Sequence, residues 1–181
     1  MYVWIDALAN YLTVIGYPDI PEWEDFWPAN VQVIGKDILR FHAGIWPAML
    51  LGLGLPLPKT LLVHGHISSN GVKMSKSIGN VIDPNEIIDN YGLDAFRYYF
   101  SRHIATQDDG DFTWEKFENA YNNELGNDLG NLASRVANMV KRYQSGVIGE
   151  IPRDEHDRHT YNNYMKDLEF NKAIDEAWGL V

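Results

Sequence analysis

Two short apolar runs near the start of the chain predict buried strands with a helix between them. The first run is Val31–Ile34, a helical pattern covers Asp37–Leu51 with a break at Pro47, and the second run is Thr60–His64. Strands that alternate with helices favour a parallel α/β sheet, whose ligands bind beyond the carboxyl ends of the strands. The polar residues that follow each run are therefore candidate ligand contacts.

The two ends of the chain carry apolar patterns without a clear start or stop. Tyr2–Ile5 predicts a buried strand that begins with no lead-in. The helical period of Phe170–Val181 breaks off at the last residue. We therefore expect the chain to be part of a longer protein.

Helix signals dominate the chain after residue 82. Asp83 is a capping residue type with proline after it and glutamate at the third helical position, which predicts a short helix ending near Gly92. A second helix is predicted from Leu93 to about His103, and Ile104–Asp111 is predicted to be a polar connector. Thr113 then caps a long helical pattern.

An apolar stripe runs along this last pattern, with members three or four residues apart. They are Trp114, Phe117, Tyr121, Leu125, Leu129, Leu132, Val136, Met139 and Tyr143. A bend is expected near Gly126 and Gly130. We predict a domain boundary near residue 112: part of a Rossmann-like α/β domain over 1–111, and the start of an all-α helical bundle over 112–181.

Composition and charge exclude several classes of protein. The 181 residues have a formal net charge of −10, which disfavours a nonspecific polybasic nucleic-acid binder but allows a local basic patch. The chain has no cysteine, which excludes disulfides and thiolate zinc sites. The longest uncharged stretch, Phe41–Pro58, is interrupted by prolines and glycines, and the N-terminus lacks a secretory pattern. We expect a cytoplasmic protein with no membrane span.

The segment Gly71–Gly79, GVKMSKSIG, is a candidate anion-binding loop, called the lysine loop below. Lys73 and Lys76 are the only formal charges between Thr60 and Ile82. Two ammonium groups so close together repel each other unless an anion lies between them, and at the edge of an α/β sheet the obvious anion is a phosphate chain. The loop is not a P-loop, which needs G-x-x-x-x-G-K-[ST]. From charge alone, a solvated surface loop is an equal alternative.

The amino-acid sequence of the lysine loop resembles a motif of a known protein family. Lys73-Met74-Ser75-Lys76-Ser77, KMSKS, is identical to the signature loop of class I aminoacyl-tRNA synthetases. Tyr2–Ala7 with Tyr11, Ile34–Ile38, and Phe41-His42 resemble segments of the methionyl-tRNA synthetase family. The resemblance implies methionine binding by Val3, Trp4, Ala7, Tyr11, Ile38 and His42. It implies ATP binding by Gly35, Asp37, His64, Lys73, Ser75 and Lys76, with Lys73 and Lys76 catalytic.

Side-chain chemistry agrees with part of this division. A thioether is apolar and polarizable, and Trp4, Tyr11 and Ile38 offer it aromatic and aliphatic walls. Asp37 follows a glycine turn and could accept hydrogen bonds from ribose hydroxyls. Two plainer interpretations stay open: Trp4 as a core aromatic, and His42 as a helix histidine with its own hydrogen bonds.

The predicted helical domain has a polar face opposite the apolar stripe. Asn127, Asn131 and Arg135 recur at every fourth residue, and Leu129–Gly149 holds three basic residues and no acidic one. Amide and guanidinium groups can bind splayed bases of single-stranded RNA loops. From the spacing alone, a solvated polar face is the better explanation. The resemblance reverses this preference and implies that these three residues face the CAU anticodon.

The family resemblance implies a methionine–tRNA ligase. It would activate methionine with ATP, accompanied by Mg²⁺, to methionyl-adenylate, and then transfer the methionyl group to tRNA(Met). Its partners would be ATP, methionine and tRNA(Met), with no DNA and no membrane.

The chain departs from the family in one respect. The other class I signature, H-I-G-H, is absent, and His64-Gly65-His66 does not replace it. We therefore expect the isolated chain to lack half of the adenylate site and to be inactive. We predict no metal site, since the pairs His64 with His66 and His156 with His159 are the only candidates; a zinc ion would belong to the parent enzyme. Alternatives are a non-catalytic RNA-binding module and another class I synthetase, of the leucyl or valyl type.

Overall fold

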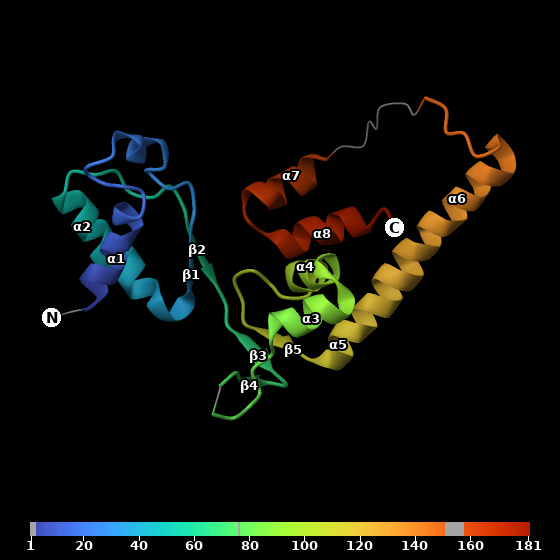
Figure 1. Ribbon diagram of the computed structural model, residues 1–181, viewed down its shortest axis with the longest axis horizontal. Helices are drawn as coiled ribbons and strands as arrows, with labels where there is room; N and C mark the ends of the chain where they lie inside the picture. Colours follow the sequence, from blue (N-terminus) through green and yellow to red (C-terminus); the bar gives the residue numbers. More distant parts are fainter. Residues whose placement is uncertain (1–2, 76, 151–157) are drawn as a thin grey trace. The chain divides into compact units, whose positions relative to one another are not determined.

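The computed structural model describes residues 3–75, 77–150 and 158–181. The chain forms two compact units, unit 1 (Met1–His66) and unit 2 (Ile67–Val181), drawn in Figure 1. The predicted boundary near residue 112, between an α/β domain and a helical domain, falls inside unit 2 and stays a prediction.

Unit 1 begins with a helix, α1 (Val3–Thr13). The strand predicted over Tyr2–Ile5 is therefore wrong for its last three residues, and Tyr2 lies outside the described residues. Leu8 and Leu12 are buried, and Trp4 packs against the same cluster, so the apolar contacts of this segment recur every fourth residue. A run of four letters is too short to reveal that period.

The predicted parallel strands are confirmed in unit 1. β1 (Gln32–Gly35) pairs in parallel with β2 (Leu61–His64), in a register that places Gly35 beside His64. The fold therefore contains a small parallel sheet whose strand ends lie next to each other. A short 3₁₀ helix, η1 (Pro21–Asp25), precedes β1.

The predicted helix between the strands forms with three different windings. It consists of the 3₁₀ helix η2 (Lys36–Ile38), the π-helix η3 (Phe41–Ile45) and α2 (Trp46–Gly52). Pro47 lies at the start of α2, where its missing N–H is not needed. The π-helical turn η3 comes directly before this proline.

The core of unit 1 is built from aromatic and aliphatic residues of these helices and of the segment between η1 and β1. Its buried members are Leu8, Leu12, Trp27, Phe41, Trp46 and Leu50. Trp46 donates a hydrogen bond to the buried Gln32 Oε1 at 3.2 Å, which ties α2 to β1.

Unit 2 opens with a hairpin that the sequence analysis missed. β3 (Ile67–Ser69) pairs antiparallel with β4 (Val72–Lys73), and Asn70 and Gly71 form the two-residue turn with φ of 54° and 71°. Positive φ at both positions is the geometry that Asn-Gly favours in tight hairpins. β5 (Gly110–Phe112) pairs with β3 in parallel, so the last two residues of the predicted connector Ile104–Asp111 are a strand.

The two helices predicted after Asp83 are confirmed. α3 (Pro84–Tyr91) starts where the Asp83 side chain accepts a hydrogen bond from the Asn85 amide. Gly92, with φ of 89°, separates it from α4 (Leu93–Arg102). Both helices face a buried cluster composed of Ile87, Ala95, Tyr99, Phe112, Phe117 and Ala120.

The long helical pattern after Thr113 is also confirmed. α5 (Trp114–Asn119) is capped by the Thr113 hydroxyl, which accepts from the Lys116 amide at 3.1 Å. It continues through the π-helix η4 (Ala120–Leu129) into α6 (Gly130–Gln144). The irregularity expected near the two glycines thus takes the form of a π-helical segment.

The apolar stripe of this helix is buried only at its beginning. Phe117 is 1% exposed, whereas Val136, Met139 and Tyr143 are 50%, 57% and 70% exposed. We call Leu132, Val136, Met139 and Tyr143 the α6 face. Within the described residues, each side chain of the α6 face is at least 37% exposed.

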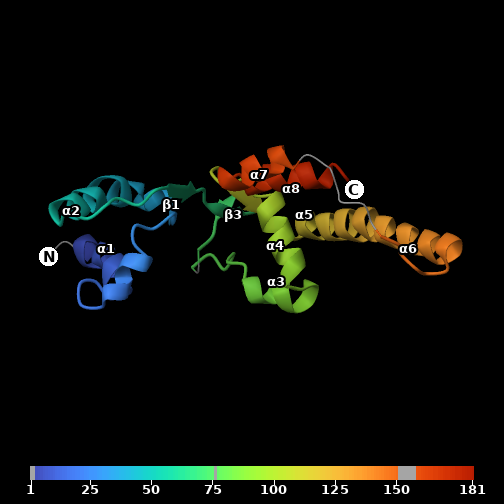
Figure 2. The ribbon, with the colours of Figure 1, turned by 90° about the horizontal axis from the view of Figure 1, so that it is seen from above.

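The last two helices of unit 2 are α7 (His159–Lys166) and α8 (Phe170–Trp178). α8 packs against α4, and α7 packs on α8, as Figure 2 shows from above. Arg102 Nε of α4 donates to Asp175 Oδ1 of α8 at 2.9 Å, which fixes that contact. Among the helices that the structure describes, none is long and apolar enough to span a membrane.

Candidate functional site

The carboxyl ends of β1 and β2 bring three predicted ATP-binding residues together. Gly35 and His64 are paired in the parallel ladder, and Asp37 follows one turn later with its Oδ1 3.6 Å from His66 Nε2. The Asp37 side chain is 66% exposed and so is accessible to a ligand. A Cβ atom on Gly35 would lie 2.8 Å from Asp37 Oδ1, so any other residue there would displace this exposed carboxylate from its observed position.

A second group of predicted residues surrounds His42. The Tyr11 hydroxyl lies 3.0 Å from His42 Nε2, and His42 Nδ1 lies 3.1 Å from the Ile38 carbonyl oxygen. Because a carbonyl only accepts, Nδ1 carries the proton, and Nε2 accepts from the tyrosine. His42 is therefore a buried histidine with a hydrogen-bond partner at each ring nitrogen, which agrees with the plainer interpretation of this residue.

Trp4 belongs to the same group through its ring. It stacks on Phe41 with ring centres 4.0 Å apart and an interplanar angle of 12°, and the Arg40 guanidinium lies 4.7 Å from the Phe41 centre. Trp4, Tyr11 and Ile38 are each half-buried against the core of unit 1. Their remaining surface is apolar and polarizable, as a thioether ligand requires.

The other two predicted methionine contacts are less enclosed. Val3 and Ala7 lie on α1, one turn apart, and both are exposed, Val3 to 73%. The structure thus brings Trp4, Tyr11, Ile38 and His42 into one cluster. It leaves Val3 and Ala7 on the outer surface of α1.

The lysine loop lies in unit 2, directly after the hairpin. Lys73 is the last residue of β4 and is exposed, while Ser75 is half-buried with its Oγ 2.8 Å from Ser77 Oγ. Lys76 lies outside the described residues. The predicted ATP contacts are therefore divided between the strand ends of unit 1 and the loop of unit 2.

The candidate anticodon contacts lie on the long helix of unit 2. Asn127 belongs to η4, and Asn131 and Arg135 belong to α6; all three are exposed. Asn127 Nδ2 donates to Asn123 Oδ1 at 3.2 Å, and this bond lies along the helix. The side chains are thus accessible to a macromolecular ligand.

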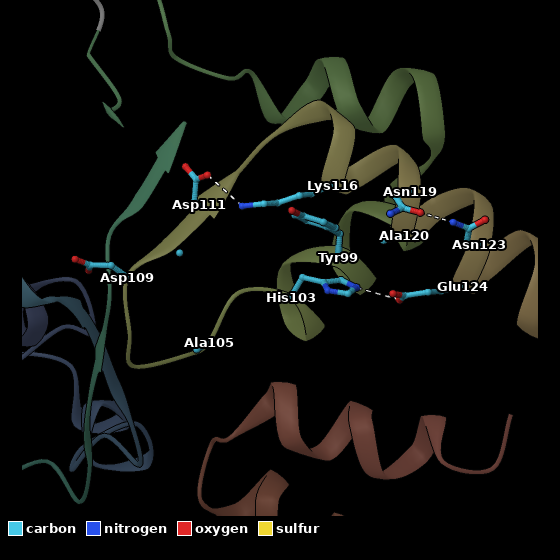
Figure 3. Close-up of a pocket in the computed structure, with 11 residues that line it drawn as sticks. Tyr99, His103, Ala105, Asp109, Asp111, Lys116, Asn119, Ala120, Asn123 and Glu124 are labelled. Atoms are coloured by element: carbon cyan, nitrogen blue, oxygen red, sulfur yellow. Dashed lines mark hydrogen bonds and ion pairs between the residues drawn. The ribbon is translucent and has the colours of Figure 1, made fainter. Parts of the chain in front are cut away.

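A polar pocket of about 470 Å³ lies between α4, β5, α5 and η4, shown in Figure 3. Its charged groups are paired: Lys116 Nζ lies 3.2 Å from Asp111 Oδ2, and His103 Nε2 lies 3.0 Å from Glu124 Oε2. Burial, with the charge of Asp111, raises the pKa of Tyr99 to about 12, which keeps this phenol neutral. The sequence analysis predicted none of these residues, because no local motif marks them.

Glu124 connects this pocket to α4. Burial acts to raise the pKa of Glu124, but hydrogen bonds from Tyr98 and His103 and the charges of His103 and Arg102 outweigh it and lower the pKa. The carboxylate is therefore held ionised by its partners. This arrangement fixes the start of the long helix against α4.

Metal ligation is not evident in the described part of the chain. Within it, no three His, Asp or Glu side chains are grouped so that they could hold a metal ion. His64 is paired with Gly35 in the parallel sheet, and His66 lies beside Asp37. His156 lies outside the described residues.

Comparison with known proteins places the chain in a family. The family model described as "tRNA synthetases class I (M)" matches residues 1–137. A curated methionine–tRNA ligase of Caldanaerobacter subterraneus subsp. tengcongensis is 45% identical over 194 residues, covering 100% of this chain and 30% of the relative. One of Clostridium tetani is 46% identical with the same coverage. The chain thus spans about a third of the length of these relatives.

Solved structures agree with the sequence comparison. The methionyl-tRNA synthetase of Mycobacterium tuberculosis bound by methionyl-adenylate matches with a TM-score of 0.84 and 36% identity, over 98% of this chain and 37% of that one. The free form of that protein matches with a TM-score of 0.81 and 31% identity. The mixed α/β fold is therefore that of methionyl-tRNA synthetase structures, and the chain belongs to the class I tRNA synthetase family.

Proposed function

We propose that this chain forms part of a methionine–tRNA ligase. One observation carries the proposal. Trp4, Tyr11, Ile38 and His42 form one partly buried cluster, and the same unit holds the paired strand ends Gly35 and His64, with Asp37 just after β1. An apolar amino-acid pocket and a polar nucleotide edge are what an enzyme needs to join methionine to ATP. The curated relatives named methionine–tRNA ligase support this choice of amino acid.

The reaction would proceed in two steps. A methionine carboxylate oxygen attacks the α-phosphorus of ATP; the bond to the β-phosphate bridging oxygen breaks, and pyrophosphate leaves. The terminal ribose hydroxyl of tRNA(Met) then attacks the carbonyl carbon of methionyl-adenylate, and AMP leaves. Trp4, Tyr11 and Ile38 would hold the thioether, Val3 and Ala7 would border it, and Asp37 would accept from the ribose.

The lysine loop would act on the charge that develops on the departing phosphates. Lys73, Ser75 and Lys76 would contact the triphosphate, and each of the two positioned lysine cations would lower the barrier by about 3 kcal/mol. Mg²⁺ would arrive with ATP, because this ion is commonly held by phosphate oxygens and water with few protein ligands. That mode fits a chain whose described residues offer no cluster of three ligands.

The anticodon would be read by the exposed residues of the long helix. Asn127, Asn131 and Arg135 would face the CAU bases of tRNA(Met), in a helical bundle that begins near residue 112. Single-stranded loops are read in this way, by amide hydrogen bonds and by stacking on guanidinium groups.

The test is methionine-dependent exchange of labelled pyrophosphate into ATP. A complete synthetase that carries this sequence should catalyse the exchange with methionine and not with leucine or valine. Lys73→Ala should lower kcat by about a hundredfold to a thousandfold. Equal exchange with leucine or valine would favour the other class I assignment.

The isolated 181-residue chain should lack this exchange, since it has no H-I-G-H motif. Exchange by the isolated chain at the rate of a complete synthetase would disprove that expectation. Binding of CAU-loop RNA without any ATP binding in the complete protein would instead favour a non-catalytic RNA-binding module.

A further inference from the structure

The lysine loop makes a tight turn just beyond β4. The Ser75 carbonyl accepts hydrogen bonds from the amides of Ile78 and Gly79, both at 3.1 Å. Gly79 has φ of 74°, a conformation that other L residues rarely adopt, so the turn depends on a glycine there. The chain therefore leaves β4 and returns towards it within a few residues.

Asn80 joins the two ends of this turn through both halves of its amide. Its Oδ1 accepts from the Ser75 amide at 2.8 Å, and its Nδ2 donates to the Lys73 carbonyl at 3.2 Å. A weaker contact of 3.4 Å reaches the Val72 carbonyl. One half-buried side chain thus fixes the backbone on both sides of Met74, next to Lys73.

The strand that Asn80 contacts is itself anchored. Asp111 Oδ1 of β5 accepts from the Gly71 amide at 2.6 Å and from the Ser68 hydroxyl at 2.8 Å. The Gly71 amide and the Ser68 hydroxyl lower the pKa of Asp111, so the anchor is ionised at neutral pH. A displacement of the hairpin would break these bonds, and Asn80 extends the same fixed framework into the loop.

We propose that Asn80 is a positioning residue for the lysine loop. It holds the backbone of Lys73 and Ser75 in one place, so that the Lys73 ammonium can meet the phosphates without first ordering the loop. An amide is suited to this task because it accepts from an N–H and donates to a carbonyl at the same time, which an ionised carboxylate or an apolar side chain cannot do. The inference rests on the proposed function, since it assigns Asn80 to the same reaction.

The first measurement concerns the loop itself, in the 181-residue chain. In Asn80→Ala, hydrogen exchange of the Ser75 amide should become about threefold to tenfold faster, as expected for loss of one net hydrogen bond. The matched control is Asn90→Ala, which removes an amide bond of 2.8 Å to the Glu86 carbonyl on exposed α3. The control should leave Ser75 exchange unchanged. Asn80→Asp retains the acceptor oxygen for Ser75 but places a second oxygen against the Lys73 carbonyl, so it should restore only part of the protection.

The second measurement concerns catalysis, in a complete synthetase carrying this sequence. Asn80→Ala should lower kcat for methionine-dependent pyrophosphate exchange by about tenfold to a hundredfold, the usual cost of a misplaced catalytic group. The KM for methionine should not change, because the cluster around His42 is not altered. A merely structural role would lower the amount of folded protein and leave the kcat of the folded fraction unchanged.

The two measurements separate this inference from the proposed function. Unchanged Ser75 exchange in Asn80→Ala would overturn the role of Asn80, whatever the enzyme does. So would an unchanged kcat in a variant that has lost the protection. If the unaltered synthetase shows no methionine-dependent exchange, the proposed function fails, and the Ser75 measurement still decides whether Asn80 holds the loop.

Discussion

Tyr11 and His42, which lie 31 residues apart in the sequence, share a hydrogen bond of 3.0 Å at the surface of the aromatic core of unit 1. This bond links α1 to the helix that follows β1, and His42 completes it by donating to Ile38. Both residues are predicted methionine contacts, so one bond bears on both stability and binding.

Removing the Tyr11 hydroxyl should lower the stability of the folded chain. Tyr11→Phe leaves the acceptor nitrogen of the buried His42 without its partner, which should reduce the free energy of unfolding by about 1 to 2 kcal/mol. Denaturant unfolding of the 181-residue chain measures this change. The control is Tyr143→Phe, because the Tyr143 side chain is 70% exposed and should tolerate the change. Equal stability of the two variants would contradict the expectation.

Arg102 should be the most sensitive charged residue of unit 2. It bridges Glu124 of η4 at 3.1 Å and Asp175 of α8 at 2.9 Å, and its guanidinium lies 4.8 Å from the Trp178 ring centre. Its side chain is only 18% exposed, so Arg102→Ala should destabilise the chain by about 2 to 3 kcal/mol. Lys172→Ala removes an exposed ion pair with Glu169 and should cause no resolvable change.

The hairpin should respond to acid through Asp111. The pKa of its carboxyl is lowered in the folded chain by the Gly71 amide and the Ser68 hydroxyl. Its contribution to stability is therefore full above the ordinary aspartate pKa of about 3.9 and is lost as the pH falls through the lower folded value. Hydrogen exchange of Gly71, compared at matched intrinsic rates, should accelerate only in that acidic range. Asp111→Asn should remove the acid dependence, and its persistence would point to another group.

Arg135 should contribute to RNA binding more than other exposed arginines. Arg135→Ala should weaken binding of a CAU-loop RNA by about 1 to 3 kcal/mol and relax its preference for that sequence. Arg97→Ala, on exposed α4 surface, provides the control for loss of one positive charge. If both variants lower affinity equally for all loop sequences, the arginine acts only through the phosphate backbone.

Local sequence patterns were sufficient to predict the helices and strands whose signals lie within a few residues of one another. The caps at Asp83 and Thr113 and the apolar runs that became β1 and β2 are examples. The short strands of unit 2 are different, because β3 is defined by its pairing with β5, more than 40 residues later. Only the Asn70-Gly71 turn, a known hairpin signal, could have revealed β3 and β4 in advance.

The candidate site also combines features that local sequence predicts with features that depend on distant contacts. The strand-end position of Gly35, Asp37 and His64 follows from the parallel α/β pattern, so it could be predicted. The enclosure of His42 by Tyr11 and Ile38 depends on packing between helices, and the pattern of either helix alone does not contain it. Asn80 was missed because an asparagine after a glycine is ordinary loop chemistry, and its importance comes from the two backbone groups it joins.

The α6 face has a consequence for how the chain behaves on heating. Its leucine, valine, methionine and tyrosine side chains lie in water, and attraction between apolar surfaces weakens on cooling and strengthens on warming. Solutions of the isolated chain should therefore stay free of aggregates for longest at low temperature. They should become turbid on warming before the helices melt, and a little urea should delay this clouding.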